Sequence, residues 1–171
     1  MVLLKSHDFS NSFAVRPLTE VDIPAILKLY ETNPYYFEHC PPPPTEACVL
    51  DDMTKLPPGK RREDKHFVGY FDKDKLIAVL DLVEGYPSEE KAFIGLFMLD
   101  KAYQGKGLGS QLIVELLESL MRQFKILRLG YVATNSPAKA FWEKQGFVPT
   151  GETSQEKQYT IILAEYLKKD K

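Results

Sequence analysis

The sequence has few cysteines and no long hydrophobic run, and each absence excludes a class of protein. Cys40 and Cys48 are the only cysteines, and no CxxC or Cys/His spacing accompanies them, so we expect reduced thiols and no metal site. The apolar run from Val2 to Leu4 is too short for a secretory signal, and no later segment reaches the length that spans a bilayer. We therefore expect a soluble, cytoplasmic protein that does not bind a membrane.

A surplus of one charge is also lacking. Lys+Arg 22 against Asp+Glu 24 gives a formal net charge of -2, so nothing in the overall balance favours nucleic acid as a partner. The 171 residues are 44% hydrophobic and 12% aromatic, which suits one domain over residues 1–171 with its own core. No internal repeat is visible. The segment NPYYFEHCPPPP, residues 33–44, predicts a stiff connector inside that domain, because proline lacks an amide proton and has a fixed φ.

Hydrophobic periodicity predicts alternating strands and helices. Strands are predicted at residues 14–18, 65–72, 75–85, 91–100, 125–134, 147–153 and 157–167, and helices at residues 19–33, 45–56, 108–124 and 136–145. Thr19 is the predicted N-cap of the first helix. The order β α α β β β α β α β β predicts a mixed sheet with helices on its faces, in the α/β or α+β class.

Three glycines open the third of these helices, in the stretch YQGKGLGSQL from Tyr103 to Leu112. A helix start exposes backbone N–H groups without partners and carries partial positive charge, and glycines let an anion approach those groups closely. The dinucleotide pattern G-x-G-x-x-G fails because Ser110 stands at its sixth position, and the phosphate-loop pattern G-x-x-x-x-G-K-[ST] is absent. Another kind of anion site is therefore indicated; the alternative is a tight turn that binds no ligand. The leucines that follow the glycines form a core stripe.

The pattern Gln104-x-x-Gly107-x-Gly109, after an apolar strand and before a helix, resembles the acetyl-CoA signature [RQ]-x-x-G-x-[GA] of the GNAT superfamily of N-acetyltransferases. Asn135 followed by SPAKAFWEKQGF resembles the second block of that family, and the element order is similar to its fold. The resemblance implies a GNAT-like acyl-CoA N-acyltransferase fold, with a mixed, mostly antiparallel sheet of about seven strands flanked by about four helices.

The same resemblance implies a function. The expected reaction is direct transfer of the acetyl group of acetyl-CoA to a primary amine, on a small molecule or a peptide. We expect a monomer or a homodimer. The alternative is a non-catalytic acyl-CoA-binding sensor or scaffold of the same fold.

Site residues follow by position from the resemblance. It implies that the backbone of Phe97, Met98 and Leu99 lines the pantetheine arm, with an amide near Leu99 as oxyanion donor. The residues expected to bind the cofactor around its pyrophosphate are Gln104, Gly105, Lys106, Gly107, Leu108, Gly109 and Ser110. Lys106 either binds phosphate or is only solvated. Asn135 either binds the cofactor, which the resemblance favours, or caps the helix that follows it.

The general acid of the family is a tyrosine in an FY pair, whereas this chain has Phe141 and Trp142. An indole N–H cannot deliver a proton at useful pH, so Trp142 is expected to pack or to form a wall of the cofactor site. Tyr131 is the nearest tyrosine, and it either assists the leaving thiolate or lies in the core. Asp81, inside the apolar run IAVLDLVEG, is a candidate base, a cation anchor, or a structural carboxylate paired with a nearby lysine or arginine.

Overall fold

The structure is a computed structural model that describes residues 4–169. One seven-stranded sheet forms its centre, with the strand order β1-β2-β3-β4-β5-β7-β6. The strands are β1 (Ala14–Pro17), β2 (Lys65–Asp72), β3 (Lys75–Glu84), β4 (Lys91–Leu99), β5 (Ile126–Val132), β6 (Val148–Gln155) and β7 (Thr160–Leu167). Every neighbouring pair is antiparallel except β4 and β5, which are parallel. The predicted mixed, mostly antiparallel sheet is confirmed.

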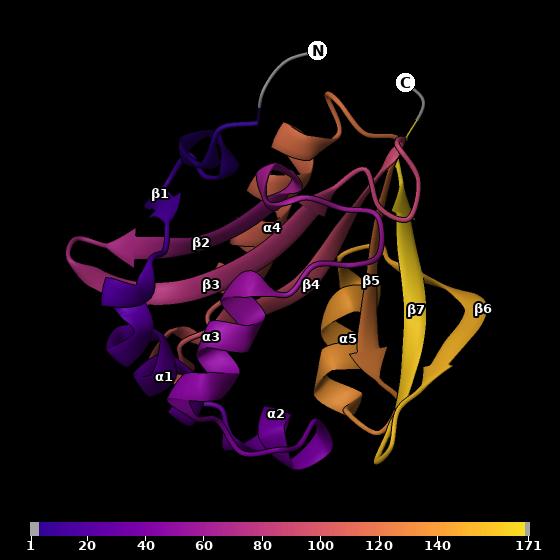
Figure 1. Cartoon of the computed structure of the whole chain (residues 1–171). Coiled ribbons are helices and arrows are strands. Elements are labelled where there is room, and N and C mark those ends of the chain that lie inside the picture. The colour runs from indigo at the N-terminus through magenta and orange to yellow at the C-terminus, as the bar shows by residue number, and fades with distance from the viewer. Residues whose placement is uncertain (1–3, 170–171) are drawn as a thin grey trace.

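Helices cover both faces of the sheet, as Figure 1 shows. They are α1 (Ile23–Glu31), α2 (Pro34–His39), α3 (Glu46–Thr54), α4 (Leu108–Leu120) and α5 (Ser136–Lys144). Short 3-10 turns lie at Ser6–Phe9, Glu20–Asp22, Arg62–Asp64 and Lys101–Tyr103. Within residues 4–169 no helix is long and apolar enough to cross a membrane.

Two apolar layers hold the helices to the sheet. On one face α4 and α5 bury side chains such as Leu112, Leu116 and Trp142 against Leu80 and Leu129 of the sheet. On the other face α1 and α3 bury a second layer against β2, β3 and β4, formed by Ile26, Leu29, Tyr30, Val49, Phe67, Val79, Leu96 and Met98. The strands between the layers are apolar on both faces, which explains why residues 76–83 of β3 are all buried.

Two details of the first helices differ from the sequence-based prediction. The segment 33–44 contains the short helix α2, because Pro34 occupies a first-turn position where its missing N–H is not needed; the four prolines come after this helix. The first helix begins at Ile23 and not directly after Thr19, since residues 20–22 form a 3-10 turn. In that turn the Thr19 backbone N–H donates to Asp22 Oδ2 at 2.8 Å.

Candidate functional site

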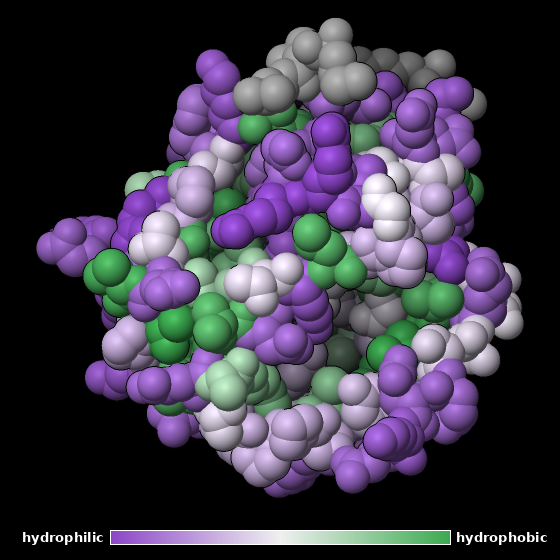
Figure 2. All heavy atoms as spheres, in the orientation of Figure 1, coloured by the Kyte–Doolittle hydropathy of each residue, from purple (hydrophilic) through white to green (hydrophobic). Residues whose placement is uncertain are grey.

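The sheet opens between β4 and β5. These parallel strands pair only from Lys91 to Ile94 on β4 and from Ile126 to Leu129 on β5. Gly95 comes next and is a bulge, because Leu82 faces Ile94 while Asp81 faces Leu96. Beyond the bulge β4 stays paired with β3 but no longer with β5. Figure 2 shows the molecular surface hollowed in this region, between α3 and the β5–β7 side of the sheet.

The open edge of β4 presents peptide groups to this gap. The Asp100 N–H donates to the Ile77 carbonyl at 2.8 Å, and Leu99 faces Ala78 in the register. In an antiparallel ladder this makes Leu99 a non-hydrogen-bonded position, so its N–H and C=O point away from β3. The alternation gives Phe97 the same orientation and turns the Met98 backbone toward β3. Of the three residues predicted to line an arm, Phe97 and Leu99 therefore turn their peptide groups away from β3, and the N–H of each faces the opening.

The Leu99 carbonyl is bound by two side chains. Gln104 Nε2 donates to it at 2.7 Å and Asn33 Nδ2 at 3.1 Å, and Gln104 Nε2 also donates to Asn33 Oδ1 at 2.7 Å. Thr32 Oγ1 accepts the N–H of Lys101 at 3.1 Å. The turn between α1 and α2 is thereby tied to the end of β4.

The glycines at the start of α4 have two different tasks. Gly105 and Gly107 both have φ of +81°, a conformation that side chains disfavour, and a Cβ on either would meet no atom within 4 Å. Gly109 instead makes room for packing, since a Cβ there would lie 3.1 Å from the Phe141 ring. Two of the three glycines thus border open space.

The N-terminus of α4 has free donors. The N–H of Gln111 makes the first bond of the helix, to the Gly107 carbonyl at 3.1 Å, so the N–H groups of residues 108–110 have no partner within the helix. Gly107 provides no side-chain cap, and the first turn contains no acidic residue. Lys106 is exposed beside it. Ser110 Oγ accepts a hydrogen bond from Gln145 Nε2 at 2.8 Å. This end of α4 can bind an anion through its backbone.

Asn135 is buried and caps α5: its Oδ1 accepts the N–H of Ala138 at 3.1 Å. The cap that the sequence left as an alternative is therefore present, and any role in cofactor binding falls to the remaining amide group. The preceding residue, Thr134, makes a 2.6 Å hydrogen bond through Oγ1 with His39 Nδ1. That bond joins the end of α2 to the segment after β5.

Trp142 lies in an aromatic cluster behind the gap. Its indole makes edge contacts with the rings of Phe97, Phe141 and Phe147, and the Phe97 and Phe141 rings stack with centroids 6.3 Å apart. Trp142 is buried in the layer that packs α4 and α5 against the sheet, and Phe97 of β4 joins that layer from the strand. Through its contact with Phe97, Trp142 supports the stretch of β4 backbone that borders the opening.

Tyr131 is buried on the face of β5 that carries α4 and α5. Within residues 4–169 its hydroxyl has no hydrogen-bond partner. Burial, together with the charge of Glu143, raises the pKa of this hydroxyl. The tyrosine is a core residue of this layer.

Asp81 lies beside the bulge and is paired with Lys65. Its side chain is buried, with Oδ2 3.2 Å from Lys65 Nζ, and a Cβ on Gly95 would come within 2.7 Å of the same oxygen. Lys65 Nζ also donates to the carbonyls of Asp52 at 2.6 Å and Lys55 at 2.8 Å. Oδ1 of Asp81 has no partner among the residues that the structure describes.

Burial dominates the ionisation of this pair. It raises the pKa of Asp81, and the attraction of Lys65 offsets only part of that rise. It likewise lowers the pKa of Lys65 in spite of the nearby carboxylate. Asp81 therefore combines a raised pKa with a lysine partner, so both the candidate base and the structural carboxylate remain consistent with its surroundings.

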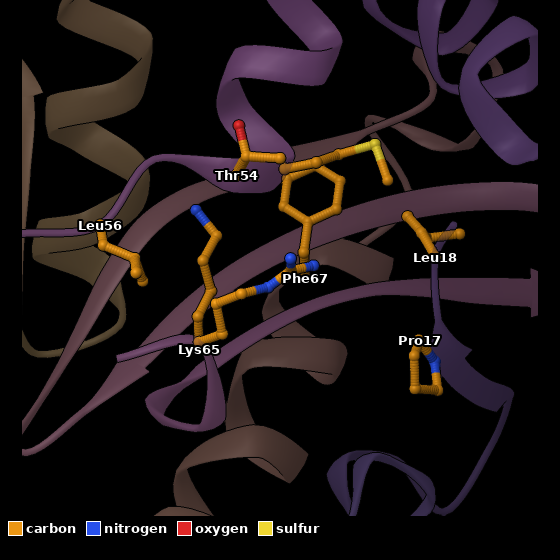
Figure 3. Close-up of a pocket in the computed structure, with 8 residues that line it drawn as sticks. Pro17, Leu18, Thr54, Leu56, Lys65 and Phe67 are labelled. Carbon is orange, nitrogen blue, oxygen red and sulfur yellow. The ribbon is translucent and has the colours of Figure 1, made fainter. Parts of the chain in front are cut away.

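A pocket of about 170 Å³ lies beside Lys65, between the ends of β1 and α3 and the start of β2. Figure 3 shows Lys65 and Phe67 reaching toward the end of α3, with Pro17 and Leu18 on the opposite side. Neither Asp81 nor any residue of β4 lines it. The pocket is thus separate from the opening between β4 and β5.

Sequence reasoning missed Asn33, His39 and Lys65. Asn33 precedes Pro34, a signal for a helix start that the proline run obscured. Lys65 lies on the same face of the sheet as Asp81, but only the strand register brings them together, since Lys65 faces Val83 and Phe67 faces Asp81.

Comparison with known proteins identifies the family. A family model described as the acetyltransferase (GNAT) family matches residues 23–147. The chain belongs to this GNAT acetyltransferase family. The matched segment runs from α1 to the residue before β6 and contains β4, the glycines and α5. Among curated proteins, none matches the chain.

Solved structures of GNAT proteins share the fold. An acetyltransferase from Thermus thermophilus is 25% identical, with a TM-score of 0.73 over 91% of this chain and 96% of that one. The PaiA N-acetyltransferase from Thermoplasma acidophilum, solved in complex with coenzyme A, is 19% identical, with a TM-score of 0.64 over 91% and 99%. The ribosomal-protein-S18-alanine N-acetyltransferase from Escherichia coli is 18% identical, with a TM-score of 0.64 over 91% and 93%. Family and fold together support acyl transfer as the class of activity.

The buried pair yields a prediction about stability. Lys65→Met leaves Asp81 buried without its cation, which should cost about 3–5 kcal/mol of unfolding free energy near neutral pH. The folded variant then favours protonated Asp81 even more, so its folded pKa lies further above the unfolded value. Stability should therefore fall as pH rises from the unfolded aspartate pKa, about 4, towards neutral pH. Urea unfolding over this range measures both effects.

The double variant Lys65→Met with Asp81→Leu is the control, because it removes both charges. It should recover most of the lost stability and lose the added pH dependence. Equal stability of Lys65→Met and the unmodified protein at neutral pH would contradict the burial argument.

Proposed function

We propose that this protein transfers the acetyl group of acetyl-CoA directly to a primary amine. One observation carries the proposal: the peptide groups of Phe97 and Leu99 face a gap in the sheet, and the uncapped start of α4 follows a few residues later. The Phe97 peptide groups and the Leu99 N–H on this edge suit the amides of a pantetheine arm, and uncapped helix N–H groups suit a pyrophosphate.

The residues of the site fit such a co-substrate. Gly105 and Gly107 border open space where a Cβ would stand in the way of a phosphate, and no acidic residue in the first turn of α4 would repel it. Lys106 adds a positive charge at the same place. The PaiA protein solved with coenzyme A shares the fold, which supports a CoA-type ligand for this chain too.

Each residue then has a stated role. The Leu99 N–H donates to the oxygen that becomes negative when the neutral amine attacks the acetyl carbon. A bond forms from the amine nitrogen to that carbon, the carbon–sulfur bond breaks, and CoA leaves as a thiolate. Asp81, whose pKa is raised by burial, accepts the proton that the amine releases, or binds the incoming ammonium. Solvent protonates the thiolate, because Trp142 has no proton to give and Tyr131 lies in the core.

The acceptor is an amine on a small molecule or a peptide, and the acting species is a monomer or a homodimer without nucleic acid or membrane. Two free cysteines are in keeping with a cytoplasmic site of action.

The decisive experiment mixes the protein with acetyl-CoA and a panel of amines and measures the release of free CoA thiol together with the acetylated product. Release that depends on a particular amine supports the proposal.

A second candidate function is a non-catalytic acyl-CoA sensor of the same fold. Trp142 in place of the family's tyrosine favours it. Acetyl-CoA that stabilises the protein against heat, without amine-dependent release of thiol, would support this alternative.

Gly107, which directly precedes α4, gives a prediction about ligand binding. Gly107→Val should weaken acetyl-CoA binding by about tenfold or more, roughly 1.4 kcal/mol, because the side chain occupies the space next to the helix amides. Gly59→Val is the matched control: Gly59 has φ of +79°, also with no atom within 4 Å of a Cβ. Both variants suffer the same kind of backbone strain. Calorimetry that finds equal affinity in the two variants would remove this loop from the binding site.

Asp81→Asn tests the role of the buried carboxylate. If Asp81 is the base, kcat should fall roughly 100-fold or more and the acid limb of the pH profile should flatten, with little change in acetyl-CoA affinity. If Asp81 only anchors the ammonium, KM for the amine should rise instead. A variant with the kcat/KM of the unmodified protein would make Asp81 purely structural.

Trp142→Phe should keep substantial turnover, because the indole supplies packing and no proton. The aromatic contacts with Phe97 are expected to survive in part, so stability should fall modestly while acetyl-CoA binding persists. Steady-state kinetics at saturating acetyl-CoA measure this. A loss confined to the chemical step would show that the indole takes part in the reaction.

A further inference from the structure

The first residue of the glycine motif, Gln104, makes contacts that leave its amide group no free hydrogen. Its Nε2 carries two hydrogens, and one goes to the Leu99 carbonyl at 2.7 Å while the other goes to Asn33 Oδ1 at 2.7 Å. The remaining oxygen of the side chain can only accept. Gln104 therefore has no donor left for a phosphate, although it begins the motif that is expected to bind one.

The contacts of Gln104 converge on a single carbonyl. Asn33 Nδ2 donates to the same Leu99 oxygen at 3.1 Å, so both lone pairs of that oxygen are used. The next peptide N–H, of Asp100, is bonded to Ile77 at 2.8 Å, and that of Lys101 to Thr32 Oγ1 at 3.1 Å. The peptide after Leu99 is thus held from β3, from the α1–α2 turn and from Gln104. The N–H of Leu99 lies one peptide earlier and faces the gap.

We propose that Gln104 and Asn33 are positioning residues that hold the Leu99 carbonyl so that the Leu99 N–H points at the acetyl oxygen. The inference rests on the proposed function. Asn33 lies between α1 and α2, so the same bonds set the place of α2 relative to β4. Neither side chain touches the reacting atoms. Each acts through the backbone of Leu99.

The test uses variants of Gln104 that have a side chain of similar size but differ in the number of hydrogen-bond donors. Gln104→Met removes both donated bonds without adding charge, and should lower kcat at saturating acetyl-CoA and amine by about tenfold to 100-fold, as misplacement of a reacting group does. The dissociation constant of acetyl-CoA, measured by calorimetry, should change by less than about threefold, since no phosphate contact is lost.

Gln104→Arg restores N–H donors and should recover most of kcat. Asn33→Leu removes the other donor to Leu99 and should lower kcat in the same direction. Gln123→Met is the control for the substitution itself, because Gln123 lies beyond the far end of α4, and it should leave kcat unchanged.

Amide hydrogen exchange supplies a readout that needs no turnover. The Asp100 and Lys101 amides should exchange at least about tenfold faster in Gln104→Met than in the unmodified protein, because their peptide loses its support. If no amine releases thiol from the unmodified protein, the proposed function fails, and faster exchange without loss of acetyl-CoA affinity still supports the positioning of Leu99.

Three results would overturn the inference. Unchanged kcat with an acetyl-CoA dissociation constant raised about tenfold in Gln104→Met would mean that this side chain binds phosphate. Unchanged exchange at residues 100 and 101 would mean that the bonds do not hold the peptide. A kcat that Gln104→Arg fails to restore would mean that the donors are not what matters.

Discussion

The separation of β4 from β5 is the constraint on which the rest of this structure depends. Parallel strands normally continue side by side, but here the pairing stops after Ile94, where Gly95 bulges out of β4. Past that point one edge of β4 has no neighbouring strand. The N–H and C=O groups on that edge must therefore find hydrogen-bond partners elsewhere. The Leu99 carbonyl finds them in Gln104 and Asn33. The aromatic cluster around Trp142 supports the strand from behind.

Buried charges of the sheet are compensated at two places. Lys65 is paired with Asp81 on the β2–β3 side, and Arg128 and Lys91 are paired with Glu165 on the β5–β7 side. Both clusters are partly or fully buried, where an unpaired charge would be costly. The contrast is the start of α4, which carries positive partial charge and no acidic neighbour in its first turn. The electrostatic attraction for an anion is therefore concentrated at the helix start.

Local patterns were sufficient to predict much of this fold. The β-branched runs and the leucine stripe of α4 are signals within short windows, and they predicted the strands and the helices. The anion site at the glycines stays a prediction. The helix α2 was missed because its six residues are flanked by prolines, whose composition indicates a connector. Asn135 could be a ligand or a cap by type alone, and only its 3.1 Å bond to Ala138 shows the cap.

Contacts between distant segments lay beyond such patterns. Asn33 and Gln104 meet across 71 positions, and Lys65 and Asp81 meet because two strands pair in one register and not in another. An alternating pattern could not set the register of β3, since residues 76–83 are buried on both faces. The role of Gln104 illustrates this, because its place in the motif suggests a phosphate while its partners are a carbonyl and an amide.

The helix α2 is attached at both ends to opposite sides of the gap. Asn33, just before it, is bonded to Leu99 at the end of β4, and His39, its last residue, is bonded to Thr134 just after β5. Six helical residues extend about 9 Å. The helix therefore acts as a spacer of fixed length between the two strand ends. Lengthening or shortening this segment by one residue would alter the width of the opening itself. The number of residues in α2 therefore matters as well as their types.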